Sequence, residues 1–367
     1  MILLELTGTA ITVIGGVSAV GITASVFGIR KLVRIGQFSY HNARLSTMGN
    51  PYIIRDEVLP LLELKDPSTL IKTIQGDLSF KEEPTSFRES DRQLMHNFHG
   101  TLDALYIGSP SGVKPLVKSF IGIWEIDELK RLLRLIGHRE EPLYPVGFLD
   151  EDLERQFLSA RDTAQAIEVL EGTRAGKAIA PLAKEEGVGL DEIDSVLDRF
   201  VLDTFMDLDG LDSACRKGAK DFSHILADRY NIHLLVRSKA SGLGREEIMP
   251  QIYSKGGTIG LPLLEQMAES SNLRETLSVL NGTHLENYFK DGAERGTHAI
   301  EIALDRMLLE ASVGLSHTHG STVGPSIRYL IGKEMELKNI RTLLQAVFSG
   351  WSQERTKELL ILEVTAS

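Results

Sequence analysis

Apolar residues recur at intervals of three and four along most of the chain, which is the spacing of one face of an α-helix. The alternation of apolar and polar residues that is typical of half-buried strands is scarce, and Gly or Pro interrupts the helical stretches. The pattern therefore predicts an all-α protein built from helices that pack on one another.

Three of the predicted helices share one arrangement of side chains: an acid, a polar residue three positions later, and then an apolar stripe. The acids are Glu125, Asp228 and Glu336, which are 103 and 108 residues apart, and the polar residues are Glu128, Asn231 and Asn339. The stripes start at Leu129, Ile232 and Ile340. We predict that the stripes lie in the core and that the acid and the polar residue hydrogen-bond neighbouring helices.

A glycine that ends a helical pattern precedes each of these helices. Gly76, Gly172 and Gly282 lie 49, 56 and 54 residues before the three acids, in sequences that fit helix C-caps. Two landmarks in the same order, three times, predict three homologous helical units. We place them at residues 38–145, 146–258 and 259–367, after an N-terminal segment at residues 1–37.

The N-terminal segment has the length of a membrane-spanning helix. Residues 6–29 carry no charge, and as a helix they would be about 36 Å long. Arg30, Lys31 and Arg34 follow, which predicts that the rest of the chain lies on the cytoplasmic face of the cell membrane. A secretory signal would have its basic residues before the apolar run. We predict an apolar helix here that anchors the protein, and a surface-lying or protein-buried segment is the alternative.

The charge balance argues against a nucleic-acid-binding protein. The 367 residues include 40 Lys and Arg and 51 Asp and Glu, which gives a formal net charge of −11, whereas phosphate binding relies on clustered basic residues. Cys215 is the only cysteine, so the chain has no internal disulfide and no cysteine-based zinc site.

No motif in the sequence predicts an enzyme or a bound cofactor. The chain has no P-loop, since Gly172 to Lys177 is one residue too short and continues with Ala178. His317 and His319 lie in a predicted polar, Gly-rich loop, which would need further ligands to hold a metal and which we otherwise expect to be solvent-exposed and idle. We therefore predict a protein without catalytic residues, cofactor or metal, and keep an enzyme built on the His317–His319 stretch as the least favoured alternative.

A charged turn follows each of the three repeated helices. Acids in the first turn of a following helix explain part of this pattern without a partner, but equivalent turns in three units would share one end of the molecule. Trp351, as an exposed aromatic side chain, would suit an interface anchor. The candidate interface residues are Arg139, Glu140, Arg245, Glu246, Glu247, Trp351, Glu354 and Arg355.

Three stretches resemble the C subunit of archaeal and vacuolar-type rotary ATPases, which is related to the d subunit of the vacuolar enzyme. They are Tyr40 to Arg44, the run from Asp228 to Lys239 with Gly256-Gly257 after it, and the run from Tyr329 to Arg341. They occur in the family's order, and the resemblance covers roughly residues 38 to 362. Glu128 departs from the pattern, since the other two units carry Asn there.

The resemblance implies a funnel of three helical domains with pseudo-threefold symmetry. It implies a non-catalytic part of the central stalk that couples the D and F subunits to the membrane proteolipid ring and transmits torque for ATP synthesis or ion pumping. The a/I subunit in the membrane is a further expected partner, and nucleic acid is not. A membrane-tethered helical scaffold of an unrelated complex is the alternative. Neither the coupling ion, proton or sodium, nor the direction of the reaction follows from this chain.

Overall fold

Helices make up all the regular structure in the part of the chain that the computed structural model describes, which is residues 36–74, 84–138, 148–182, 189–290, 294 and 296–363. The all-α prediction is confirmed. The predicted N-terminal apolar helix lies outside these residues. Among the described residues, no helix is both long and apolar enough to cross a membrane.

Six long helices form three antiparallel hairpins, each closed by a short connection at residues 109–113, 207–215 or 319–323. The hairpins are α4 (Phe87–Gly108) with α5 (Lys114–His138), α9 (Leu190–Met206) with α10 (Arg216–Ala240), and α16 (Thr297–Thr318) with α17 (Gly324–Ser349).

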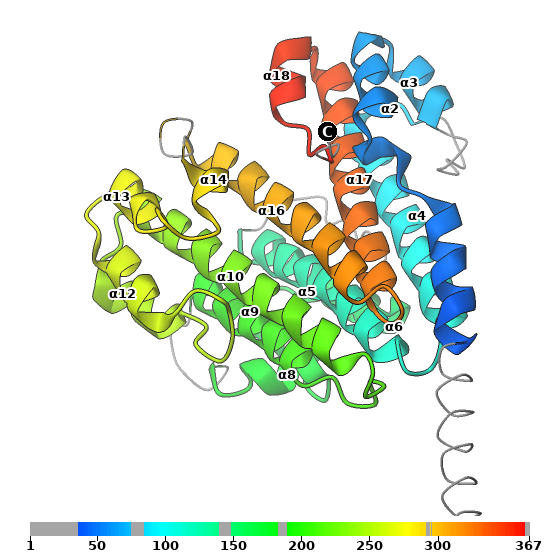
Figure 1. Ribbon diagram of the computed structural model, residues 1–367. Coiled ribbons are helices and arrows are strands. Elements are labelled where there is room, and N and C mark those ends of the chain that lie inside the picture. The colour runs from blue at the N-terminus through cyan, green and yellow to red at the C-terminus, as the bar shows by residue number, and fades with distance from the viewer. Residues whose placement is uncertain are drawn as a thin grey trace, which may run out of the picture.

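The six long helices contact one another in a closed ring. Along this ring α5 meets α9, α10 meets α16, and α17 meets α4, so that each hairpin touches the other two. Figure 1 shows the hairpins side by side, with the C-terminal ends of α10 and α17 pointing away from each other. The three inter-hairpin contacts are called seams below.

Groups of short helices pack near the end of the second helix of each hairpin. The group on α17 follows a helix at 36–48, and α18 (Gln353–Glu358) joins it from the C-terminal side. The groups are η1 (Pro51–Ile53), α2 (Arg55–Val58), η2 (Leu59–Glu63) and α3 (Pro67–Ile74); α6 (Glu151–Leu158), α7 (Thr163–Val169) and α8 (Arg174–Ile179); and α11 (Arg245–Ile248), η4 (Met249–Gln251), α12 (Leu261–Glu269), α13 (Leu273–Ser278) and α14 (Glu286–Phe289).

The predicted apolar stripes form the centres of three separate core clusters. The α5 stripe from Ile126 to Ile136 packs with α6 to α9, and the α10 stripe at Ile232, Leu235 and Val236 packs with α11 to α16. The α17 stripe belongs to the largest cluster, where Leu344 has no exposed surface. The prediction that the stripes are core is confirmed. The boundaries of three homologous units stay a prediction.

Candidate functional site

The polar residue of each repeated helix is buried and binds the backbone of the segment that follows it. These residues, Glu128, Asn231 and Asn339, are called the polar landmarks below. Asn231 exchanges two hydrogen bonds of 2.9 Å with Tyr253, and Asn339 exchanges bonds of 2.8 and 2.7 Å with Ile361. Glu128 lacks a side-chain donor and instead accepts from the amides of Phe148 (2.6 Å) and Leu149 (3.1 Å). Buried backbone groups in non-helical segments need such partners.

These contacts agree with the predicted structural role but correct its partner. The landmarks bind the backbone of non-helical chain that lies 20 to 22 residues downstream, and Asn339 also bonds a neighbouring helix, through the Tyr52 carbonyl of η1. Side chains supply partners for the amides of a non-helical segment that has no helix or sheet hydrogen bonds of its own. Each landmark thus fixes the direction in which the chain leaves its hairpin.

The contacts of the three acids, Glu125, Asp228 and Glu336, differ more from one repeated helix to the next than those of the polar landmarks do. The Asp228 carboxylate accepts from the amides of Thr258 (2.9 Å) and Ile259 (3.0 Å). Gly257, with φ +113°, makes this approach possible, because a Cβ there would lie 2.6 Å from Asp228 Oδ1. Glu336 accepts from the amide of Tyr52 at 3.2 Å. Glu125, in contrast, has an exposed side chain, so the acid of the first repeated helix faces solvent.

An ion pair from one equivalent position spans each seam. The position is two residues after the polar landmark, and its partner lies on the first helix of the adjacent hairpin. Lys130 Nζ lies 2.7 Å from Asp198, and Arg341 Nε lies 2.6 Å from Asp91. His233 lies 3.5 Å from Glu301 and pairs with it when protonated. One sequence position in each repeated helix thus supplies a contact to an acid of the adjacent hairpin.

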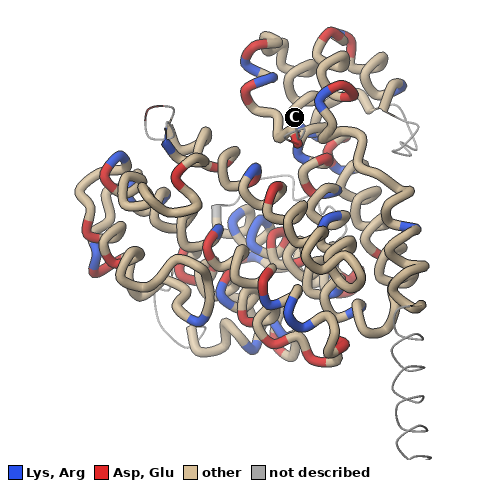
Figure 2. Tube along the Cα trace, in the orientation of Figure 1, with Lys and Arg blue, Asp and Glu red and all other residues tan. Residues whose placement is uncertain are grey.

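Further charged residues converge at the middle of the long helices, where Figure 2 shows basic and acidic positions close together. Arg229 on α10 and Lys338 on α17 both bind Asp305 on α16, at 2.9 and 2.8 Å, and Lys338 also binds Glu334 at 2.9 Å. We call this set the interior belt: Asp127, Lys130, Asp198, Arg229, Asp305, Glu334 and Lys338.

The carboxylates of the interior belt respond to their surroundings in opposite directions. Burial alone would raise the pKa of Asp305, but Lys338 and Arg229 overcome it and hold the pKa below its ordinary value. Burial raises the pKa of Asp127 to about 6, and the nearby carboxylates Asp198 and Glu334 add to the rise against Lys130. The surroundings of Asp305 thus favour its charged form, whereas those of Asp127 disfavour it.

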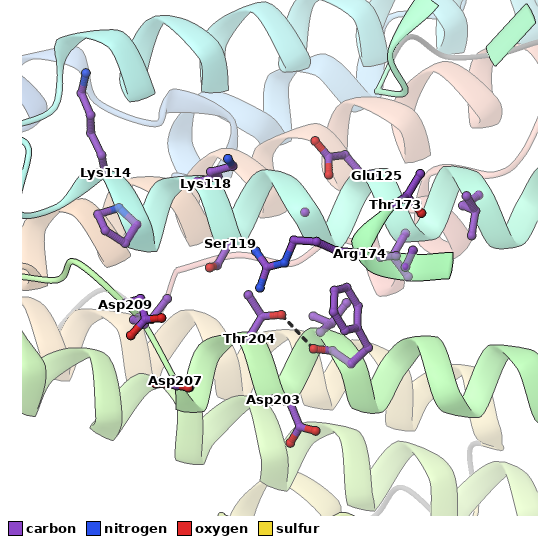
Figure 3. Close-up of a pocket in the computed structure, with 18 of the residues that line it drawn as sticks. Lys114, Lys118, Ser119, Glu125, Thr173, Arg174, Asp203, Thr204, Asp207 and Asp209 are labelled. Carbon is purple, nitrogen blue, oxygen red and sulfur yellow. Dashed lines mark hydrogen bonds between the residues drawn. The ribbon is translucent and has the colours of Figure 1, made fainter. Parts of the chain in front are cut away.

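A cavity of about 840 Å³ lies between α5 and α9, with α8 at one end. In Figure 3, Arg174 reaches between the two long helices toward Ser119 and Thr204. The Arg174 guanidinium lies 5.7 Å from the Phe200 ring, and the Thr204 hydroxyl donates to the Phe200 carbonyl at 2.9 Å. The described lining includes no histidine or cysteine, so neither hydroxyl has a neighbouring imidazole to act as a base.

The sequence matches the family described as ATP synthase (C/AC39) subunit over residues 41–359. The chain belongs to this family. The match spans all six long helices together with the landmark and seam residues. The resemblance noted from Tyr40 to Arg44, Asp228 to Lys239 and Tyr329 to Arg341 is confirmed.

Curated relatives of the same family are distant in sequence but similar in length. A protein of Methanocaldococcus jannaschii, named as the C subunit of A-type ATP synthase, is 22% identical over 323 residues, which are 83% of this chain and 78% of that protein. A protein of the same name from Methanothermobacter thermautotrophicus is 23% identical over 367 residues, or 95% and 94% of the two chains. A third, from Methanobrevibacter smithii, is 28% identical over 253 residues, 65% of each.

In this member of the ATP synthase (C/AC39) subunit family, the described interface candidates follow α10 and α17, five of them in the short helices α11 and α18 and Trp351 in the turn before α18. Arg139 and Glu140 lie outside the described residues. Arg245 is ion-paired with Glu269 at 3.1 Å, and Glu247 accepts from the Gly244 amide at 2.9 Å, which caps α11. Glu246 is exposed in the first turn of α11. Their use as an interface stays a prediction.

The turn after α17 places Trp351 in a groove. The groove, about 440 Å³ in volume, is lined by η2 on one side and by the end of α17 and Glu354 on the other. Arg355 covers the Trp351 ring, with its guanidinium carbon 4.3 Å from the ring centroid. Trp351 is therefore half-buried rather than fully exposed.

The His317–His319 stretch has a structural explanation that corrects the sequence interpretation of an idle polar loop. His317 belongs to the last turn of α16, and His319 is buried with its Nε2 atom 2.9 Å from an Asp221 carboxylate oxygen. Gly218 of α10 makes room, because a Cβ there would lie 2.9 Å from the imidazole. Among the described residues, no three His, Cys, Asp or Glu side chains gather as a metal site.

The interior belt is the site that sequence reasoning missed. Its pairs between helices join residues 33 to 76 positions apart, and no local sequence pattern predicts such contacts. A signal was present for the seams but not for the rest of the belt, since Lys130, His233 and Arg341 all stand two positions after a polar landmark. Equal placement on three repeated helices points to one ring of inter-hairpin contacts.

Proposed function

We propose that this protein is a non-catalytic coupling subunit of an A/V-type rotary ATP synthase or ATPase. It connects the rotating shaft, the D and F subunits, with the membrane proteolipid ring, and it transmits torque in ATP synthesis or ion pumping. The observation that carries the proposal is the family match over residues 41–359, together with curated relatives named as the C subunit of A-type ATP synthase.

The architecture supports a part that carries load between two other bodies. Densely packed helix interiors resist compression, and a basic side chain or histidine at one equivalent position contacts an acid across each of the three seams. A closed ring passes a twisting load from one hairpin to the next, because every hairpin contacts the other two. ATP chemistry belongs, in this proposal, to other subunits of the complex.

Membrane association follows from the same proposal. The protein sits on the cytoplasmic face of the cell membrane, against the proteolipid ring and near the a/I subunit. Residues 6–29, which lie outside the described residues, supply an apolar anchor in the bilayer or in the lumen of the ring.

Affinity purification of the tagged protein from detergent-solubilised native membranes tests the coupling function. Mass spectrometry should recover the proteolipid together with the D and F subunits. Recovery of neither, from membranes that hold the intact ATPase, would replace the coupling function with the scaffold alternative.

A chain that begins at Gln37 tests the anchor. We expect this shortened protein to keep its helical circular dichroism and to lose most of its binding to detergent-free vesicles, since it lacks the apolar run. Flotation of vesicles on a sucrose gradient measures the bound fraction, and the full chain is the control. Equal flotation of the two proteins, or full retention of ring binding by the shorter one, would exclude residues 6–29 as an anchor.

A further inference from the structure

We propose that Asp127 is a docking residue, and that it receives a lysine or arginine side chain of the shaft inserted between the long helices. This inference rests on the proposed coupling function and names the chemistry of the partner at that site. Three observations carry it: the charge count of the interior belt, the accessibility of Asp127, and its position between hairpins.

The interior belt contains four carboxylates and three cations. Lys130 bonds to Asp198 at 2.7 Å, Arg229 bonds to Asp305 at 2.9 Å, and Lys338 bonds to Asp305 and Glu334. The cation of the belt that lies near Asp127 is Lys130, at 4.0 Å, and its short bond is to Asp198. Asp127 is therefore the surplus acid of the belt.

Asp127 is also the carboxylate of the belt that a partner reaches most easily. Its side chain is 55% exposed, whereas those of Asp198, Asp305 and Glu334 are 35%, 11% and 10% exposed. Asp305 and Glu334 are thus mostly covered by the helices around them. The surplus acid thus combines solvent access with an uncompensated charge.

The position of Asp127 directs it to the inside of the ring. It lies on α5, and its charged neighbours are Lys130 on the same helix, Asp198 on α9, Arg229 on α10 and Glu334 on α17. Along the ring α9 separates α10 from α5, so a side chain of α5 that feels Arg229 must face the interior. A body held between the hairpins would meet Asp127.

The chemistry of this site suits a basic side chain better than a metal ion. Magnesium and calcium require several oxygen ligands around one point, and no such group of three acids or histidines gathers in the described part of the chain. One accessible carboxylate can accept the N–H donors of a single ammonium or guanidinium. Partial burial between the helices, together with the carboxylates of Asp198 and Glu334, raises the pKa of Asp127 to about 6, and an added cation would favour its charged form.

Binding of the purified full chain to the D–F shaft complex tests the inference by titration calorimetry at pH 7.5. We expect Asp127→Asn to weaken binding by about tenfold or more, since a charge-assisted hydrogen bond is lost, and Asp127→Lys to weaken it further. Asp152→Asn is the matched control, because the Asp152 side chain is 78% exposed on α6 and pairs with Arg155 of that same helix. It should bind like the wild type.

The pH dependence provides a readout that a structural role would not produce. Wild-type affinity should fall below pH 6, as Asp127 takes up a proton that the cation must displace, and the Asp127→Asn affinity should change much less. Thermal unfolding serves as the check on folding. The folded-state pKa of Asp127 is raised, so the wild type loses stability as pH rises from about 4 through 6, and the Asn variant should have the higher midpoint at pH 7.5.

Two results would overturn the inference, and they are distinguishable. Equal shaft affinity for the wild type and Asp127→Asn, both at pH 7.5 and below pH 6, would exclude Asp127 as a docking residue. The proposed coupling function would be unaffected by that result. Failure of the wild type itself to bind the shaft removes the coupling function and this inference with it.

Discussion

Replacing Asn339 with leucine should destabilise the protein by about 3 kcal/mol or more. Asn339 is fully buried, and its amide pairs with the Ile361 amide and carbonyl and donates to the Tyr52 carbonyl at 2.8 Å. Leucine has a similar volume but makes none of these three buried hydrogen bonds. Urea unfolding followed by circular dichroism measures the loss.

Asn231→Leu is the matched control for this prediction. Asn231 is as deeply buried as Asn339 but holds only Tyr253, so its replacement should cost less, about 2 kcal/mol. Hydrogen exchange should increase around residues 51–53 and 359–363 in the Asn339 variant, and around 253 in the control. A loss below 1 kcal/mol for Asn339→Leu would contradict the importance of these bonds.

Replacing Asp305 with asparagine should cost about 3 kcal/mol at neutral pH, because it leaves Arg229 and Lys338 in the belt without their shared carboxylate. The folded-state pKa of Asp305 is lowered, so its contribution is present above the unfolded pKa of about 4 and is lost as pH falls through the folded value. The difference between wild type and variant should therefore shrink in acid. Urea unfolding at pH 7.5 and at pH 3.5 measures it.

An exposed ion pair gives the scale for comparison. Asp152 and Arg155 lie 3.2 Å apart on α6 with both side chains mostly exposed, so Asp152→Asn should cost less than about 1 kcal/mol. Equal losses for Asp305→Asn and Asp152→Asn would mean that the interior belt contributes no more than surface charge does.

The sequence predicted those parts of the fold that depend on periodicity. The stripes at Leu129, Ile232 and Leu344 follow helical spacing, and burial of apolar area is what such spacing encodes. The landmarks Asn231 and Asn339 were predicted to have a structural role because uncharged polar residues amid an apolar face need partners. Their actual partners depend on how the chain leaves each hairpin, which no local pattern states.

The candidate site was less predictable because its contacts are tertiary. Asp305 meets Arg229 and Lys338 only after three hairpins have packed together. His319 misled the sequence interpretation for the same reason, since its partner Asp221 lies 98 residues earlier on α10. In contrast, Glu247 and Ser352 at the charged turns act as local caps, which short-range chemistry predicts.

The contacts of Asn339 also determine where the ring can open. The peptide chain joins α5 to the short helices packed on it, and α10 to its own, but the short helices at residues 51–74 reach α17 only through non-covalent contacts. Asn339, Glu336 and the 2.9 Å bond between the Glu363 amide and the Ile53 carbonyl fasten that joint. The ring of hairpins is thus continuous along the peptide chain from the first hairpin to the third, and non-covalent contacts alone close it between the third and the first.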